Sequence, residues 1–202
     1  KEIRDDSHRL ELLKGTIRAR IVAQPRVFRV DTPLGDAIDL GCAYELTVDE
    51  ERSVLTVTAG EVAFLFDGSE VWVPAGATCT SARGSGPSSP RFADTTPEVL
   101  ELVRALDSDP REPDPAALTA LAALSLERRE DALPLFHLLL RGGPELRTVV
   151  GKLLSGTFPL PGATSLEGVL ADGAHGEAAR AAWFEASKRW FLGQGPKGRR
   201  AR

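Results

Sequence analysis

The stretch from Leu10 to Ala82 alternates apolar and polar residues almost without interruption. A period of two is typical of strands that bury one face and expose the other. Glycine, proline and aspartate separate the alternating segments, as turns require. The pattern predicts a β-rich module whose strand register is set by its turn residues. These residues are Gly15, Pro33, Gly35, Gly41, Gly60, Gly68, Pro74 and Gly76.

The predicted core of this module consists of apolar residues on the alternating segments. The candidates are Val27, Val30, Ile38, Leu40, Tyr44, Leu46, Val48, Leu55, Val57, Val62 and Phe64. We expect roughly seven to nine strands, arranged as a β-sandwich or a short β-solenoid.

The composition changes near residue 84, where the segment RGSGPSSPRFADTTP is typical of a linker or of a long ordered excursion. Beyond it, apolar residues recur with helical spacing. We expect helices that begin at Pro97, Pro115 and Pro144, and two more over about 128–141 and 177–192. The stripe of the third helix contains Leu133, Phe136, His137 and Leu140. Short helices with one apolar face predict stacked αα-hairpins.

The expected fold class is therefore α+β, with two domains. A β-domain covers residues 1–92, and we expect it to lack its N-terminal part. An α-helical subdomain covers residues 93–202 and ends in a disordered basic tail. The tail contains Lys197, Arg199, Arg200 and Arg202.

Composition argues against a nucleic-acid or direct membrane partner. The net charge of −4 provides no positive field that would attract nucleic acid or anionic lipid. No apolar run approaches the roughly 18 residues that a spanning helix needs. The chain contains no methionine and starts with KEIRDD, so we expect a processed piece whose membrane anchor lies outside it.

The residue pattern contains no recognisable catalytic or metal-binding set, and we expect no enzymatic activity and no cofactor. A histidine on an apolar helix face, such as His137, favours a buried, hydrogen-bonded core residue over a catalytic base. The glycine-rich segment 84–87 lacks the lysine that a phosphate-binding loop requires. No histidine occurs between Arg9 and Leu135, although the segment 54–79 resembles half of a cupin barrel.

Two features leave alternatives open. Cys42 and Cys79 lie beside predicted strands, and they are either buried small residues or a disulfide in an oxidising compartment. Trp183, Trp190 and Phe191 lie along one stripe of the last predicted helix. They serve either as core residues or as anchors for a protein partner.

The β-rich segment resembles the FecR-type domain of envelope-located anti-sigma regulators. The matching elements are LLKGTIRARI, RVFRVDTPLGDAIDLGCAYELTVD, LTVTAGEVAF and VPAGATCTS, within about Leu10 to Phe92. The resemblance implies a periplasmic β-rich domain that follows a transmembrane helix and relays an envelope signal to a sigma factor. The helical region replaces the receptor-facing module that iron-uptake members of this family have.

We therefore expect a non-enzymatic sensor that acts through contact with protein partners in the envelope. The contact would use a face or an edge of the β-module, or a groove of the helices. One alternative is a cupin-like barrel that binds a small ligand or acts as an enzyme. Another is a structural or assembly module of the envelope.

Overall fold

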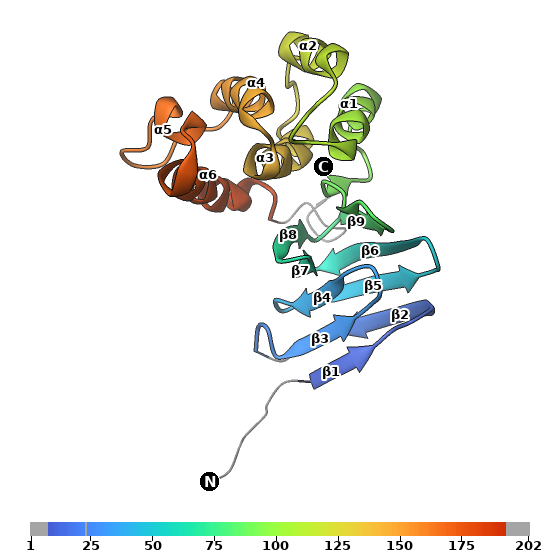
Figure 1. Cartoon of the computed structure of the whole chain (residues 1–202). Helices are drawn as coiled ribbons and strands as arrows, with labels where there is room; N and C mark the ends of the chain where they lie inside the picture. Colours follow the sequence, from blue (N-terminus) through green and yellow to red (C-terminus); the bar gives the residue numbers. More distant parts are fainter. Residues whose placement is uncertain (1–7, 23, 193–202) are drawn as a thin grey trace, which may run out of the picture. The chain divides into compact units, whose positions relative to one another are not determined.

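The computed structural model describes residues 8–22 and 24–192, and the chain divides into two compact units. Unit 1 comprises Lys1–Ala93 and Leu192–Arg202, and unit 2 comprises Asp94–Phe191. Unit 1 consists of strands and unit 2 of helices, so the fold is α+β (Figure 1). The predicted basic tail lies outside the described residues.

The described part of unit 1 contains nine strands of four or more residues and two strands of only two residues. The strands are β1 (His8–Glu11), β2 (Gly15–Arg20), β3 (Phe28–Asp31), β4 (Asp36–Asp39), β5 (Ala43–Val48), β6 (Arg52–Ala59), β7 (Glu61–Phe66), β8 (Ser69–Pro74), β9 (Ala77–Ala82), β10 (Gly86–Pro87) and β11 (Arg91–Phe92). Sequence alternation does not predict β10 and β11 because each is too short to show a period.

The strands form two sheets with open ends. One sheet has the order β1-β3-β4-β7-β8, and the other has the order β10-β9-β6-β5-β2, with β11 also paired to β9. The hairpins β3–β4, β5–β6 and β7–β8 alternate between the two sheets (Figure 1). No closed barrel is formed by the described strands, so the cupin-like barrel proved wrong as a fold.

The core of unit 1 lies between the two sheets and follows the alternation. Nine of the eleven predicted core residues are buried, whereas Val27 and Leu40 are only half-buried because they lie beside strands rather than within them. All six glycines predicted at turns have positive φ values. The residues after 84 form an ordered excursion, since β10 and β11 both pair with β9.

Unit 2 consists of six α-helices and two short 3-10 helices. The α-helices are α1 (Pro97–Ser108), α2 (Pro115–Ala123), α3 (Ala132–Arg141), α4 (Pro144–Ser155), α5 (Leu166–Leu170) and α6 (Gly173–Ser187). The 3-10 helices are η1 (Arg129–Asp131) and η2 (Lys188–Trp190). The three proline starts are confirmed, whereas α5 was not predicted and α6 begins four residues before the predicted start.

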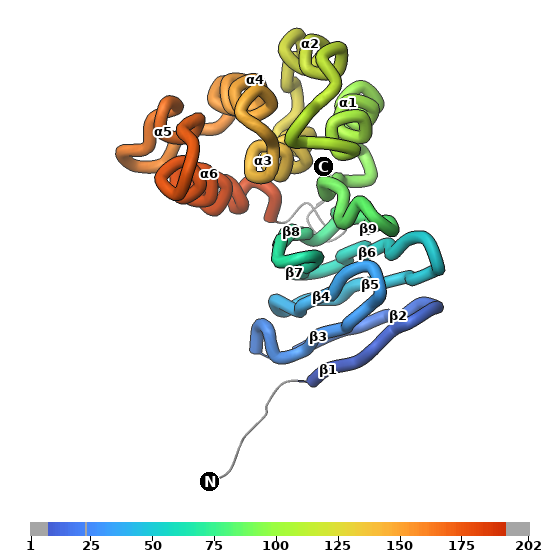
Figure 2. The backbone as a smooth tube through the Cα atoms, in the orientation of Figure 1, coloured from blue at the N-terminus to red at the C-terminus, as the bar shows by residue number. Residues whose placement is uncertain are grey.

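Helix α3 is the centre of unit 2 (Figure 2). It contacts α1, α4 and α6, and every residue from Ala132 to Leu139 is buried. The predicted stripe was therefore too narrow: Leu133, Phe136 and His137 are buried as predicted, but so are the residues between them, because other helices surround α3. Phe136 contacts Phe158, Trp183, Phe184 and Phe191 with ring centroids 5.2–6.0 Å apart.

Two turn glycines give a matched test of the sandwich. Gly60 has a φ of 69°, and a Cβ there would lie 1.9 Å from the carbonyl oxygen of Gly41. Gly68 has a φ of 76°, but a Cβ there would meet nothing within 4 Å. We expect Gly68→Ala to lower the free energy of unfolding by about 1–2 kcal/mol, the cost of the left-handed backbone. Gly60→Ala adds a collision with backbone and should cost clearly more.

Urea denaturation of both variants measures this difference. Equal losses of stability in the two variants would contradict the close approach of Gly60 to Gly41.

Candidate functional site

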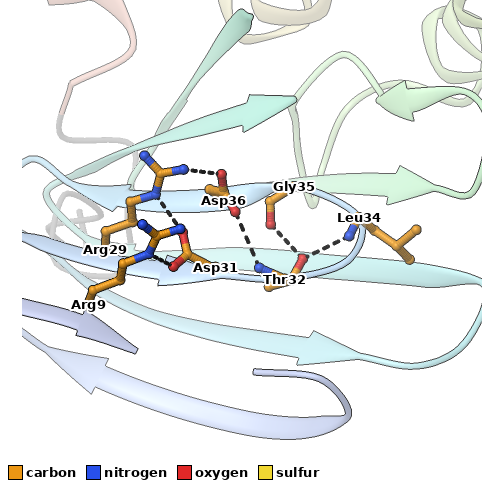
Figure 3. Close-up of polar contacts among 7 residues, drawn as sticks. All are labelled: Arg9, Arg29, Asp31, Thr32, Leu34, Gly35 and Asp36. Atoms are coloured by element: carbon orange, nitrogen blue, oxygen red, sulfur yellow. Dashed lines mark hydrogen bonds and ion pairs between the residues drawn. The ribbon is translucent and has the colours of Figure 1, made fainter. Parts of the chain in front are cut away.

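The turn between β3 and β4 is closed by one threonine side chain (Figure 3). Thr32 Oγ1 donates to the carbonyl oxygen of Gly35 at 2.5 Å and accepts from the N–H of Leu34 at 3.2 Å. The N–H of Thr32 donates to Asp36 Oδ1 at 3.3 Å. These bonds hold the Asp36 carboxylate at the start of β4.

An ion-pair chain connects this turn to the first strand (Figure 3). The parallel pairing of β1 with β3 places Arg9 opposite Arg29, and like charges in that position repel. Asp31 offsets the repulsion because it accepts from Arg9 and, at 2.6 Å, from Arg29 Nε. Arg29 also pairs with Asp36. The chain of charges thus holds β1 onto its sheet.

The charges of this chain shift the pKa values of its members. Burial raises the pKa of Asp31, but the hydrogen bonds and charges of Arg9 and Arg29 outweigh it, and the net pKa lies below its ordinary value. The hydrogen bond to Asp31 raises the pKa of Arg29. Both groups are therefore more firmly charged than in free solution.

Strands β1 and β2 end the two sheets, and they follow one another in the chain. Among the described residues, β1 pairs only with β3 and β2 only with β5. Three of the four exposed large apolar side chains of residues 8–22 and 24–192 lie here. They are Leu10 (38% exposed), Leu13 (64%) and Val22 (93%). We call residues 8–22 the open end of unit 1.

The two faces of β2 differ in chemistry. Ile17 and Ala19 pair with the buried residues Leu46 and Tyr44, but both are only half-buried themselves. Thr16, Arg18 and Arg20 alternate with them and are exposed. The apolar layer between the sheets is therefore incompletely covered at the open end.

The open end carries excess positive charge. Arg18 pairs with Glu45 at 2.6 Å, yet its side chain is 83% exposed. Lys14 pairs with Glu50 at 2.9 Å, and both side chains are exposed. No described residue forms an ion pair with Arg20. Surface ion pairs of this kind leave the cations accessible to a partner.

The predicted Cys42–Cys79 bridge does not form in the structure, where both cysteines are buried and free. Cys79 on β9 pairs with Leu55 on β6, and β6 separates β9 from β5, which Cys42 precedes. Two inter-strand spacings amount to about 10 Å, whereas the Cα atoms of a disulfide lie about 4.4–6.8 Å apart. Sequence separation alone does not reveal the intervening strand.

Each thiol donates to its own acceptor in the β-core. Cys42 Sγ lies 2.6 Å from Oδ1 of the buried Asp39, which also accepts from the N–H groups of Gly41 and Cys42 at 3.0 Å. Cys79 Sγ lies 3.2 Å from the carbonyl oxygen of Ser88. Burial, together with the bond to Asp39, raises the pKa of the Cys42 thiol. A protonated, buried thiol is a poor nucleophile.

The three residues of the predicted aromatic stripe differ in burial. Trp183 and Phe191 are fully buried around Phe136, so these two are core residues, which is one of the two alternatives that the sequence left open. Trp190 is half-buried, and the guanidinium of Arg129 lies 4.1 Å from its ring centroid. Residues 188–190 follow α6 directly as the 3-10 helix η2, which has three residues per turn, so the spacing of an α-helical stripe does not extend to Trp190.

The histidines do not form a reactive group. His137 is 3% exposed and packs against Phe184, with ring centroids 5.0 Å apart. His8 and His175 are exposed. Across residues 8–22 and 24–192, no cluster of three or more His, Cys, Asp or Glu side chains is placed to hold a metal ion.

A groove of about 330 Å³ lies between α2 and α4. It is lined by Leu121, Ala122, Thr148, Val149, Lys152 and Leu153. The sequence predicts a partner groove on the helices at the aromatic stripe of the last helix, and none of the stripe residues lines this groove. It carries a single cation and no exposed main-chain edge, so the open end of unit 1 offers more points of recognition.

None of the described helices is long and apolar enough to span a bilayer.

Comparison with known proteins does not assign a family. No protein-family model and no curated protein matches the chain. Two crystal structures, each provisionally described as an anti-sigma factor from Parabacteroides distasonis, are similar to part of it. The first, at 1.65 Å resolution, is 18% identical with a TM-score of 0.39 and covers 49% of each chain. The second, at 2.50 Å, is 17% identical with a TM-score of 0.38 and covers 55% of this chain.

The chain spans 49% and 60% of the length of these two structures. At such TM-scores the likeness assigns neither a fold nor a function to this chain.

An edge of the β-module was among the expected contact surfaces, but the sequence did not identify residues 8–22 as that edge. The segment GTIRAR contains its signal, since arginines on one face alternate with apolar residues on the other. The alternation is the same in any half-exposed strand, however, and which strand ends a sheet depends on pairing with residues far along the chain.

The two thiols should be unreactive in the folded protein. We expect Cys42 and Cys79 to resist iodoacetamide in native protein and to react fully in urea without a reductant, because the thiolate is the reactive form. Mass spectrometry counts the labels. Ser69→Cys, at an exposed position, provides a control thiol that reacts in the folded state. Two blocked thiols after unfolding would contradict the structure and restore the disulfide.

Asp31→Asn should reduce the acid sensitivity of unit 1. A carboxylate whose folded-state pKa is lowered stabilises the fold above its unfolded pKa of about 4. That contribution is lost as the pH falls through the folded-state pKa. We expect the variant to lose about 1 kcal/mol near neutral pH and to lose less than the parent on acidification.

The comparison uses urea denaturation at several pH values between about 3 and 6. Asp36→Asn is the matched control, because Asp36 contacts one arginine and Asp31 contacts two. A parallel pH dependence of the parent and Asp31→Asn would contradict the role of Asp31.

Proposed function

We propose that this chain is a non-enzymatic sensor and regulatory module of the FecR type. It lies on the periplasmic side of the inner membrane and acts through contact with envelope proteins. The contact changes the state of an anti-sigma regulator and so the transcription that the sigma factor directs. The membrane anchor of such a regulator lies outside this chain.

One observation carries the proposal, which is the open end of unit 1. It combines two sheet edges that pair with no strand of residues 8–22 and 24–192 with the exposed apolar residues Leu10, Leu13 and Val22. Exposed edges and apolar patches are costly for a soluble protein, and they commonly mark interaction sites. The resemblance of the same segment to FecR-type domains supports a regulatory partner.

The other groups of the described chain favour contact over catalysis. The pKa of the Cys42 thiol is raised, chiefly by burial, and His137 is enclosed by apolar residues. None of the exposed large apolar side chains found in residues 8–22 and 24–192 lies on a helix. An assembly platform built on the helices therefore has no specific observation in its favour.

A complementation experiment in the source organism tests the proposal. We expect deletion of the gene to alter transcripts of promoters that share one alternative sigma factor, as measured by RNA sequencing. The full-length gene should restore them. Leu13→Asp and Val22→Asp should each reduce restoration about tenfold, because a charge replaces an interface anchor.

Leu192→Asp provides the matched control, since Leu192 is an exposed leucine that is not among residues 8–22. All variants should accumulate to the same level, and an alkaline phosphatase fusion to the full-length product should be active. Unchanged transcripts after deletion, or full restoration by the two open-end variants, would contradict the proposal.

A further inference from the structure

We propose that the open end binds an extended acidic segment of a partner protein, which adds to β2 as an antiparallel strand. The inference rests on the proposed function and specifies the chemistry of the partner. It depends on three properties of β2, namely its free main-chain groups, its uncovered apolar face and its charge.

The main chain of β2 has one edge that pairs with no strand in the described part of the chain. The N–H of Ile21 donates to the carbonyl oxygen of Cys42 at 2.9 Å, in register with the β2–β5 ladder. Main-chain groups alternate sides along a strand, so Ile17 and Ala19 also point toward β5. The main-chain groups of Thr16, Arg18 and Arg20 therefore point to the free edge.

The apolar face of β2 explains what an added strand would gain. Ile17, Ala19 and Ile21 are half-buried although the residues opposite them, Leu46, Tyr44 and Cys42, are buried. A strand beside β2 would place alternate side chains over this uncovered layer. Those side chains should therefore be apolar.

The charge of β2 determines which residues are favourable on the other face of the incoming strand. Thr16, Arg18 and Arg20 have free main-chain groups and also expose their side chains. Residues opposite Arg18 and Arg20 on an added strand lie on the same face, where opposite charges stabilise a cross-strand pair. The incoming strand thus alternates acidic with apolar residues.

The same charges disfavour a second copy of this chain as the occupant. Antiparallel pairing of two β2 strands places the arginines of both copies on one face of the joined sheet. Like charges on neighbouring strands destabilise the pairing, and edge charges are a common protection against self-association. An acidic strand would pair its carboxylates with Arg18 and Arg20, whereas a second copy would place arginines beside them.

Binding of synthetic peptides to the full chain tests the inference. The probe is a peptide of about seven residues that alternates glutamate with valine. One control replaces glutamate by lysine, and another keeps the glutamates but carries N-methyl groups on the amides of the pairing edge. Isothermal titration calorimetry gives the dissociation constants.

We expect the acidic peptide to bind at least about tenfold more tightly than either control peptide. Arg20→Glu should weaken its binding about tenfold, since Arg20 has no ion pair with a described residue. Arg104→Glu makes the same charge change at an exposed position of α1 and should leave binding unchanged. Circular dichroism checks that both variants are folded.

Equal binding of the N-methylated peptide would overturn the inference, because attraction would then need no strand pairing. Equal binding of the lysine peptide, or no binding of the acidic peptide, would also overturn it. A dimer of the parent chain that Arg20→Glu alters would identify a second copy as the occupant instead. None of these outcomes changes the result expected in the transcription experiment, so the strand-pairing proposal can be refuted while the regulatory proposal stands.

Discussion

The carboxylate of Asp31 between two arginines is the interaction on which the open end of unit 1 depends. Parallel pairing brings Arg9 of β1 opposite Arg29 of β3, and the pair would repel without a shared anion. Because Asp31 and Asp36 neutralise the two cations, β1 can be the last strand of one sheet, with an outer edge that no other described strand pairs with. The short connection after β1 leads to β2, which is the last strand of the other sheet. One ion-pair chain thus supports a surface made from both sheets.

Local patterns predicted most of the β-unit correctly. Glycines were expected at turns, and those at 15, 35, 41, 60, 68 and 76 all have positive φ values. Alternation also predicted nine of eleven core residues, since burial on one face of a strand is a property of a short segment. The excursion after residue 84 was ambiguous, because proline and glycine are typical of linkers and proline is also tolerated in edge strands.

Errors arose where the answer depends on distant residues. The stripe of α3 was predicted too narrow, because its burial on all sides results from α1, α4 and α6. Of the two alternatives for the cysteines, the structure shows buried, free thiols, because β6 lies between the strands beside Cys42 and Cys79. Trp183 and Phe191 are core residues because Phe136 of another helix lies against them. The candidate site was missed for the same reason, because the alternation of GTIRAR does not reveal that β2 is the last strand of its sheet.

Amide hydrogen exchange of the free chain, followed by NMR, tests the open edge most directly. We predict alternating protection along β2, with fast exchange at Thr16, Arg18 and Arg20 and slower exchange at Ile17, Ala19 and Ile21. The first set points to the free edge, whereas the second donates to β5. Equal, strong protection of all six amides would contradict the account, because it would mean that the edge of β2 is already paired.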